Sequence, residues 1–331
     1  MLRAYTAILS TLMIISCGGG AGQPAPGSPA GPGSPSSWSI SGQLTDSLNG
    51  QPVSGATIAL DGQPPAMTAA DGRWRVEGTG TPQPRLSAAV RATGYITRET
   101  SITWEAGGRS DVNLDVIAER APFAIGFYRS MVRNGLEEPA SLQAVRRWTR
   151  NPNFYIRTFN PKTQRPLEQR EVSGMINTIR ETVPQLTGGQ FQAGAIETGE
   201  TAREERANYV NVYIVYEPGQ DFCGRALVGA NPGLIEINYD RCGSACSNKV
   251  TPTALAHEVG HALGFWHVDQ GIMAAVVSKV CSNVQFTEAE KVHGSLAYRR
   301  AVGNTDPDND PPAFSAVLTG SAPGIACKMA R

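Results

Sequence analysis

Between Trp38 and about Glu119, apolar and polar residues alternate in short runs. This alternation places successive side chains on opposite faces of an extended chain, so each run predicts a half-buried β-strand. Turn-forming pairs such as Asp61-Gly62 and Asp71-Gly72 separate the runs. Short strands that recur with turns between them are typical of two packed sheets, so the pattern predicts a small all-β sandwich over residues 38–119.

Beyond Pro122 the pattern changes to a mixture of helical and extended segments. Apolar residues at helical spacing predict helices in the segments 127–135, 141–148, 168–183, 251–263 and 286–300. Shorter apolar runs predict strands at 153–159, 191–196, 209–216, 224–229 and 234–239. This order of elements predicts an α+β domain over residues 122–303, followed by a C-terminal tail over 304–331.

The N-terminus has the pattern of an export signal. Arg3 precedes a short apolar run that ends at Cys17, and the run is too short to span a bilayer as a helix. Residues 18–37 are almost entirely Gly, Pro, Ser and Ala, which predicts a linker without a core. Residues 14–17, Ile-Ile-Ser-Cys, resemble the lipobox of bacterial lipoproteins, which implies lipidation of Cys17. An ordinary signal peptide with an incidental cysteine is the alternative.

Export changes how the other cysteines are interpreted. All five lie in the C-terminal half of the chain: Cys223, Cys242, Cys246, Cys281 and Cys327. In an oxidising compartment they predict disulfides. Five is an odd number, so at least one is unpaired or bonded outside the chain, and the pairing stays open. A second zinc site at Cys242 and Cys246 is the weaker alternative.

The overall charge excludes some partners. Lysines and arginines number 29, as do aspartates and glutamates, so no global field attracts nucleic acid or an anionic bilayer. We expect a monomer without a nucleic-acid partner, held at a membrane only through the lipid on Cys17. Residue 18 is glycine rather than aspartate, and the usual lipoprotein sorting pattern then implies the outer membrane of a Gram-negative envelope.

Three of the four histidines fall within residues 257–267, HEVGHALGFWH. On a helix, His257 and His261 lie one turn apart on one face, as two ligands of one zinc ion require. Glu258 cannot share that face and is placed to reach a water molecule as general base. The alternative is a core helix with satisfied histidines, but such a helix does not require this spacing.

Gly264 marks the predicted end of this helix, because a left-handed residue there lets the chain turn sharply. His267 can then return as a third ligand. Three protein ligands with one open position are typical of a catalytic zinc ion rather than a structural one.

HEVGHALGFWH resembles the metzincin motif H-E-x-x-H-x-x-G-x-x-H. Met273, six residues after His267, resembles the methionine of the family's Met-turn, which packs beneath the metal. The resemblance covers Pro122 to about Gly303. It implies a zinc protease domain with a mixed twisted sheet, an active-site helix and one catalytic Zn²⁺. Val268 follows the third histidine where astacins have glutamate and matrixins serine, so the subfamily stays open.

The residues GQLTDSLNGQPVSGATI (42–58), TAADGRW (68–74) and ATGY (92–95) resemble the carboxypeptidase regulatory-like domain. This family has a transthyretin-like sandwich and is common in exported bacterial proteins. No catalytic constellation is visible within it. The resemblance implies a spacer or docking module.

The metzincin resemblance also implies a substrate site. In that family the strand before the last sheet strand borders the cleft, and here it is the segment 224–229. An exposed edge offers unpaired backbone groups to an extended polypeptide, which predicts substrate contacts at Ala226, Leu227, Val228 and Gly229. The residues after the Met-turn would wall the pocket for the side chain that follows the cut, and their small size predicts tolerance of medium or large apolar side chains: Ala274, Ala275 and Val276.

Three further features lie outside these motifs. His293 is expected on the surface of the last helix. The aspartate-rich residues 305–312 suggest a calcium loop but lack its glycine and closing glutamate, so we expect a solvated tail. Trp266 could line the cleft or anchor the core.

The sequence therefore predicts a zinc-dependent endopeptidase anchored to a bacterial envelope, with Glu258 passing a proton from water to the leaving amine. A non-catalytic surface lipoprotein that binds a glycan or protein through the sandwich is the alternative. A metallohydrolase with a non-peptide substrate stays open as well.

Overall fold

The computed structural model of the protein describes residues 37–81, 83–104, 108–241, 249–276, 284–312 and 326–328, with the backbone alone for residues 110 and 326–328. All of the described residues belong to one compact unit. The predicted lipidation site Cys17 and Cys242, Cys246 and Cys281 lie outside the described residues. Cys223 is buried and takes part in a disulfide. Among the helices of the described ranges, none is both long enough and apolar enough to cross a bilayer.

The N-terminal part of the described chain is a two-sheet sandwich. Its strands are β1 (Ser37–Asp46), β2 (Thr57–Leu60), β3 (Ala66–Met67), β4 (Arg73–Thr79), β5 (Arg85–Arg91), β6 (Arg98–Thr103) and β7 (Arg109–Val116). One sheet has the order β4-β1-β7 and the other β3-β2-β5-β6. Every second side chain of β4 is buried, and side chains from both sheets, such as Ile40 and Val90, share one core. The predicted sandwich is confirmed.

A six-stranded mixed sheet forms the basis of the C-terminal part. Its strands are β8 (Asn153–Arg157), β11 (Ile196–Gly199), β12 (Tyr209–Val215), β13 (Gly224–Leu227), β14 (Gly233–Asn238) and β15 (Ala326–Lys328), in the order β11-β8-β12-β14-β13-β15. The first four in this order are parallel, whereas β13 is antiparallel to both β14 and β15. β9 (Phe159–Asn160) and β10 (Arg165–Pro166) form a separate pair.

The strand predicted at 191–196 begins only at Ile196. The backbone N–H groups of Gln192 and Ala195 donate to the side chains of Asn151 and Asn153 instead of to a neighbouring strand. Such side-chain acceptors compete with strand pairing.

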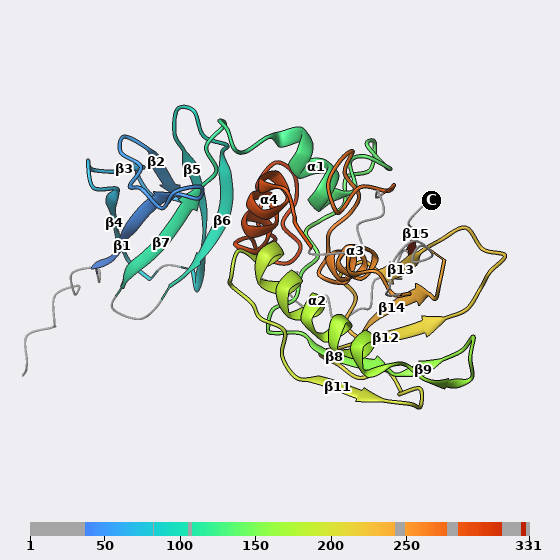
Figure 1. Ribbon diagram of the computed structural model, residues 1–331. Helices are drawn as coiled ribbons and strands as arrows, with labels where there is room; N and C mark the ends of the chain where they lie inside the picture. The colour runs from blue at the N-terminus through green and yellow to red at the C-terminus, as the bar shows by residue number, and fades with distance from the viewer. Residues whose placement is uncertain are drawn as a thin grey trace, which may run out of the picture. The chain divides into compact units, whose positions relative to one another are not determined.

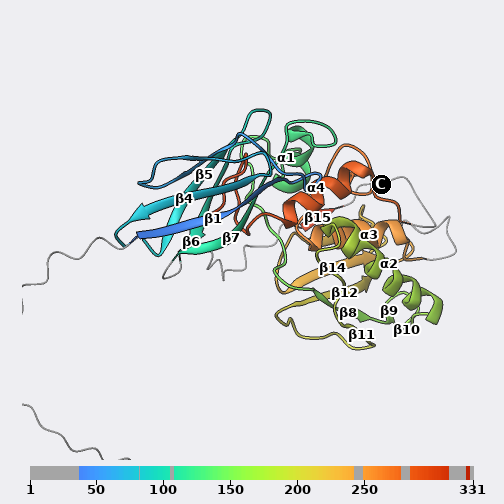
Figure 2. The ribbon, with the colours of Figure 1, turned by 90° about the vertical axis from the view of Figure 1, so that its left-hand side faces the viewer.

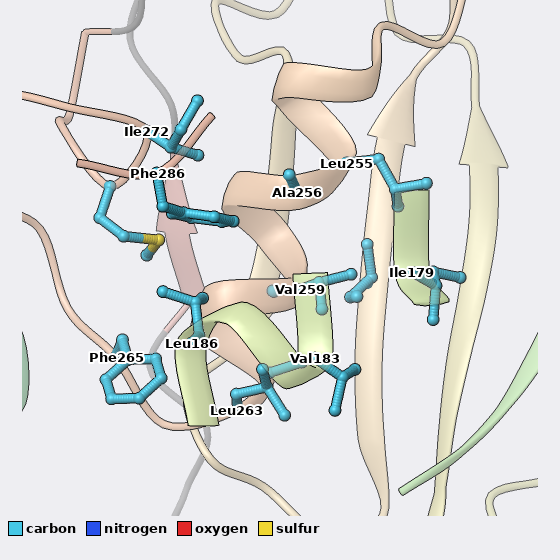
Figure 3. Close-up of a cluster of buried hydrophobic side chains, with 14 of the residues drawn as sticks. Ile179, Val183, Leu186, Leu255, Ala256, Val259, Leu263, Phe265, Ile272 and Phe286 are labelled. Carbon is cyan, nitrogen blue, oxygen red and sulfur yellow. The ribbon is translucent and has the colours of Figure 1, made fainter. Parts of the chain in front are cut away.

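In the described part of the chain four helices accompany the sheet: α1 (Ile125–Arg133), α2 (Gln169–Thr187), α3 (Pro252–Ala262) and α4 (Glu288–Tyr298). Figures 1 and 2 show α2 and α3 side by side over the sheet. Figure 3 shows the apolar side chains that join them, with Ile179, Val183 and Leu186 from α2 meeting Leu255, Val259 and Leu263 at α3. An α+β domain with a mixed sheet is therefore present, as predicted.

The segment 141–148 is irregular, so the helix predicted there is wrong. Its backbone pairs with a distant loop: the Val145 N–H donates to the Asn304 carbonyl at 2.8 Å, and the Gly303 N–H donates to the Val145 carbonyl at 2.9 Å. Trp148 donates its indole N–H to the Ala262 carbonyl at 2.8 Å. Apolar spacing alone does not reveal these tertiary partners.

The aspartate-rich segment after α4 is packed rather than solvated. Asp308 is almost fully buried and accepts a hydrogen bond from the Arg300 guanidinium at 2.7 Å. Asp306 pairs with Arg129 at 2.7 Å. The expectation of a solvated tail from residue 304 is therefore wrong for the described part, because arginines from other segments compensate the aspartates.

Candidate functional site

α3 carries the first two histidines of the motif through the interior. The Thr251 hydroxyl accepts a hydrogen bond from the backbone N–H three residues later at 3.2 Å, and Pro252 occupies the first turn, where no N–H partner is needed. Every later side chain of the helix is buried. His257 and His261 therefore lie one turn apart inside the protein, with ring centroids 4.5 Å apart.

The chain turns at Gly264, directly after the helix. The glycine has φ 108°, and a Cβ at this position would lie 1.9 Å from the Arg146 carbonyl oxygen. The turn brings His267 back, with its ring centroid 4.8 Å from that of His261. Glycine is needed at this turn for two reasons: its positive φ, and the nearby Arg146 carbonyl oxygen, which leaves no space for a side chain.

The three imidazoles present their Nε2 atoms to one another. The distances between Nε2 atoms are 2.9 Å for His257 and His261, 3.2 Å for His261 and His267, and 3.3 Å for His257 and His267. Nitrogen ligands about 2.0–2.1 Å from a tetrahedral zinc ion lie about 3.3 Å apart. Among the residues that the structure describes, no other group of three His, Cys, Asp or Glu side chains converges in this way.

Each imidazole has an acceptor at its other nitrogen. The Nδ1–H of His257 donates to the Ile272 carbonyl at 2.6 Å, and that of His261 to the Phe265 carbonyl at 2.7 Å. The third imidazole donates to the carboxylate of Glu137. These acceptors place the proton on Nδ1, which leaves a lone pair on each Nε2. Three lone pairs that face one another repel, and a bound cation removes that repulsion.

Burial favours the neutral form of the first two imidazoles. It lowers the pKa of His257 to about 3, with a smaller contribution from the nearby His267. The pKa of His261 is lowered well below its ordinary value, again mainly by burial. Neutral imidazole is the form that binds a metal. Donor type, spacing and protonation together fit one zinc ion with three protein ligands.

The Glu258 carboxylate is fully buried, and within the described part of the chain neither oxygen has a hydrogen-bond partner. Burial raises the pKa of Glu258 well above its ordinary value, because an unpaired carboxylate is costly in an apolar interior. The side chain lies against β13, since a Cβ on Gly224 would lie 2.6 Å from Glu258 Oε1. An unpartnered carboxyl beside three metal-competent imidazoles is typical of a catalytic site.

Met273 packs directly against α3 at Gly260. A Cβ on Gly260 would lie 2.3 Å from the Met273 sulfur, so a larger residue cannot replace this glycine without moving the methionine. The preceding residue, Ile272, supplies the carbonyl that accepts from His257. The segment therefore supports the three-histidine cluster through both its side chain and its backbone.

Glu290 of α4 holds the Met273 segment in place. Its Oε1 accepts from the Met273 N–H at 2.7 Å, while Oε2 accepts from the Thr287 N–H at 2.7 Å. Gly271 makes room, because a Cβ there would lie 2.6 Å from Glu290 Oε1. Glu290 also forms the capping box of α4 with Thr287. Its role at Met273 depends on a tertiary contact that no local pattern indicates.

Sequence analysis missed Glu137. Its side chain is 39% exposed, and its carboxylate contacts His267 Nδ1. It precedes His267 by 130 residues, and no motif surrounds it. A carboxylate at the far nitrogen of a metal-binding histidine fixes the ring orientation and raises the basicity of the ligand nitrogen.

The sheet edge predicted to bind substrate is already paired. Ala226 and Leu227 belong to β13, where Ala226 lies opposite Cys327 and Leu227 opposite Ala326 of β15. The prediction of an exposed edge is therefore wrong for this structure, because the C-terminal part of the same chain forms the next strand.

Val228 and Gly229 lie beyond the end of β13. Val228 is buried against Trp266, and the Gly229 N–H donates to the His261 carbonyl at 2.9 Å. The strand is thus two residues shorter than predicted, and these residues support the end of α3. Trp266 is fully buried and belongs to the core rather than to a cleft wall.

The predicted pocket wall runs from a buried to an exposed position. Ala274 is buried, Ala275 is half-buried and Val276 is 58% exposed. Ala274 follows directly on Met273, so the three residues lead from the three-histidine cluster toward the surface. Their contact with a substrate side chain stays a prediction.

His293 is buried, so the expectation of a surface residue is wrong. Its ring lies 5.4 Å from that of Phe123 and 4.8 Å from that of Phe127. Nδ1 donates to the Ala289 carbonyl at 2.7 Å, and Nε2 accepts from the Ala124 N–H at 3.0 Å. The chain around the start of α1 covers this face of α4, which the helical pattern alone did not indicate.

Comparison with known proteins identifies the sandwich alone. Residues 39–116 match the carboxypeptidase regulatory-like domain family. The match confirms that resemblance and ends before the α+β domain that holds the histidines. Curated proteins give no significant match to the chain.

Solved structures align with about a quarter of the chain. A cohesin–X-dockerin complex of Acetivibrio cellulolyticus aligns at 15% identity and TM-score 0.20, over 24% of this chain and 57% of that one. A catechol 1,2-dioxygenase mutant of Acinetobacter radioresistens aligns at 13% identity and TM-score 0.22, over 27% and 54%. A DUF3823 family protein of Parabacteroides merdae aligns at 18% identity and TM-score 0.19, over 25% and 46%. The chain thus spans just over half the length of the first two, and similarity this low has no bearing on function.

Proposed function

We propose that the protein is a zinc-dependent endopeptidase that hydrolyses extended polypeptides. One observation supports this most strongly: three Nε2 lone pairs lie within 3.3 Å of one another, beside the buried and unpartnered carboxylate of Glu258. A purely structural cluster would satisfy these groups with protein donors. Here a metal ion and a water molecule would satisfy them.

The chemistry follows from the residues around this point. His257, His261 and His267 would hold a zinc ion, which when bound lowers the pKa of a water molecule and polarises the carbonyl of the peptide bond. Glu258 would accept the proton of that water and deliver it to the leaving amine. No other described side chain hydrogen-bonds to its oxygens, so they are available to the water. Glu137 would hold His267 in the orientation that directs Nε2 to the metal.

The substrate would bind along β13 in place of β15, which pairs with this edge in the structure. Gly224, the first residue of this strand, lies against the Glu258 side chain, so a peptide on the β13 edge would pass beside the general base. Main-chain hydrogen bonds at Ala226, whose backbone groups face the outer edge, would supply affinity for an extended chain whatever its side chains. Ala274, Ala275 and Val276 would line the pocket for the residue after the cleaved bond.

The remaining parts of the chain would place the enzyme in the envelope. The sandwich would act as a spacer or docking module, and a lipid on Cys17 would anchor the protein to the outer membrane. Cys17→Ala should then move the protein from the membrane to the soluble fraction, since the acyl chains are the only strong anchoring term. Unchanged membrane fractionation of this variant would contradict the anchor.

The test of the activity combines metal content with cleavage of unfolded casein. We expect one zinc ion per chain in the wild type and in Glu258→Gln, and cleavage by the wild type only. Zinc without any cleavage would favour the non-catalytic lipoprotein or a non-peptide hydrolase. A wild type that binds no zinc after metal loading would contradict the proposed function altogether.

A further inference from the structure

The outer edge of β13 is paired with another strand over three of its four residues. β15 pairs with it antiparallel, and its three residues lie opposite Arg225, Ala226 and Leu227. β13 is otherwise the last strand of the sheet, because its other neighbour is β14. The position that a docked polypeptide would take is thus held by the chain's own backbone.

This edge also lies next to the catalytic residues. Gly224 begins β13 and contacts the Glu258 side chain, and shortly after the strand Gly229 donates its N–H to the carbonyl of the zinc ligand His261. A strand beside β13 therefore runs past the metal centre. A peptide substrate and β15 would form the same main-chain hydrogen bonds, so both cannot bind at once.

We propose that β15 is an intramolecular occupant of the peptide-docking edge and competes with substrate for β13. The inference rests on the proposed function only in naming that substrate; the occupancy itself is a property of the sheet. β15 is only three residues long, so few main-chain bonds hold it and a longer peptide can displace it. Because it belongs to the same chain, it competes at an effective concentration on the order of millimolar, as joined modules with short linkers do.

Competition of this kind predicts a change in KM rather than in kcat. Removal of residues 326–331 should lower KM for an extended peptide about tenfold or more, with kcat and zinc content unchanged. Cys327→Pro should act in the same direction, because residue 327 lies opposite Ala226 and proline removes its backbone N–H. Cys327→Ala removes the same thiol but keeps that N–H, so it controls for the loss of the cysteine. Lys328→Ala is the matched control: it changes a side chain but leaves the backbone able to pair, so KM should stay at the wild-type value.

A second measurement separates this inference from the proposed activity. Hydrogen exchange of the Ala226 amide, which faces β15, should be slow in the wild type and in Lys328→Ala, and faster in the truncated and proline variants. A fluorescent extended peptide should bind more tightly to Glu258→Gln when β15 is removed. These results would uphold the inference even if no variant cleaved peptides. Active protease with the same KM and the same β13 exchange in all variants would overturn it and leave the proposed function intact.

Discussion

The protein buries histidines in two places that differ in how their ring nitrogens are satisfied. At α3, His257, His261 and His267 are at most 2% exposed, and their Nε2 atoms meet only one another. On α4, His293 is equally buried, yet Nδ1 and Nε2 each have a backbone partner. Burial therefore does not distinguish a histidine that could bind a metal from a structural histidine. The distinguishing feature is an Nε2 lone pair that no hydrogen-bond donor of the protein satisfies.

The largest expected effect comes from removing one histidine at each place. His261→Ala should abolish stoichiometric zinc binding and casein cleavage, because two imidazoles do not complete the ligand set. His293→Ala, the matched control, should keep its zinc. Zinc per chain after dialysis, with circular dichroism to verify folding, measures both. If both variants lost zinc, or if neither did, the claim that only the cluster of His257, His261 and His267 binds zinc would be contradicted.

Glu258→Gln should show that the α3 site is catalytic as well as metal-binding. The amide has nearly the same shape but cannot accept the proton, so kcat should fall by about 100- to 10,000-fold, the usual contribution of a general base. Zinc content should stay at one per chain, because Glu258 is not a ligand. If this variant kept the wild-type kcat, Glu258 would not be the general base, and another group would transfer the proton.

Glu137 sharpens the comparison, since its carboxylate takes the place at His267 that backbone carbonyls take at the other two ligands. Glu137→Ala should weaken zinc binding about 10- to 100-fold. Glu137→Gln retains an acceptor and should weaken it less. Competition with a chromogenic chelator measures the zinc affinity. Glu138→Ala, at the next exposed position, is the control, and an equal effect there would refute a specific role for Glu137.

The smallest effect is expected at the structural site. His293→Ala removes the acceptor of the Ala124 N–H and the ring that packs on Phe123 and Phe127. The free energy of unfolding should fall by about 1–3 kcal/mol, as measured by urea denaturation of the zinc-loaded protein. If zinc affinity fell as well, α4 would be coupled to the metal centre more closely than its contacts indicate.

The sequence alone predicted the local features of both domains. Alternation identified the sandwich, because a strand with one buried face must alternate. The turn at Gly264 and the spacing of the three histidines lie within residues 257–267, so helix geometry and the turn after the helix were enough to predict that their rings come together. Prediction from the sequence failed where contacts with distant segments determined the local structure or burial, as at residues 141–148, at His293 and at the buried Asp308.

Other features depended on contacts between residues far apart in the chain. Glu137 reaches His267 across 130 residues, Glu290 holds the Met273 segment from α4, and β15 pairs with β13 across about a hundred residues. Helix and strand periods describe interactions between near neighbours, so a pattern along the chain cannot reveal such partners. The sequence by itself determined which residues could bind a metal, whereas the tertiary structure decided what holds the third ligand and which strand occupies the edge beside it.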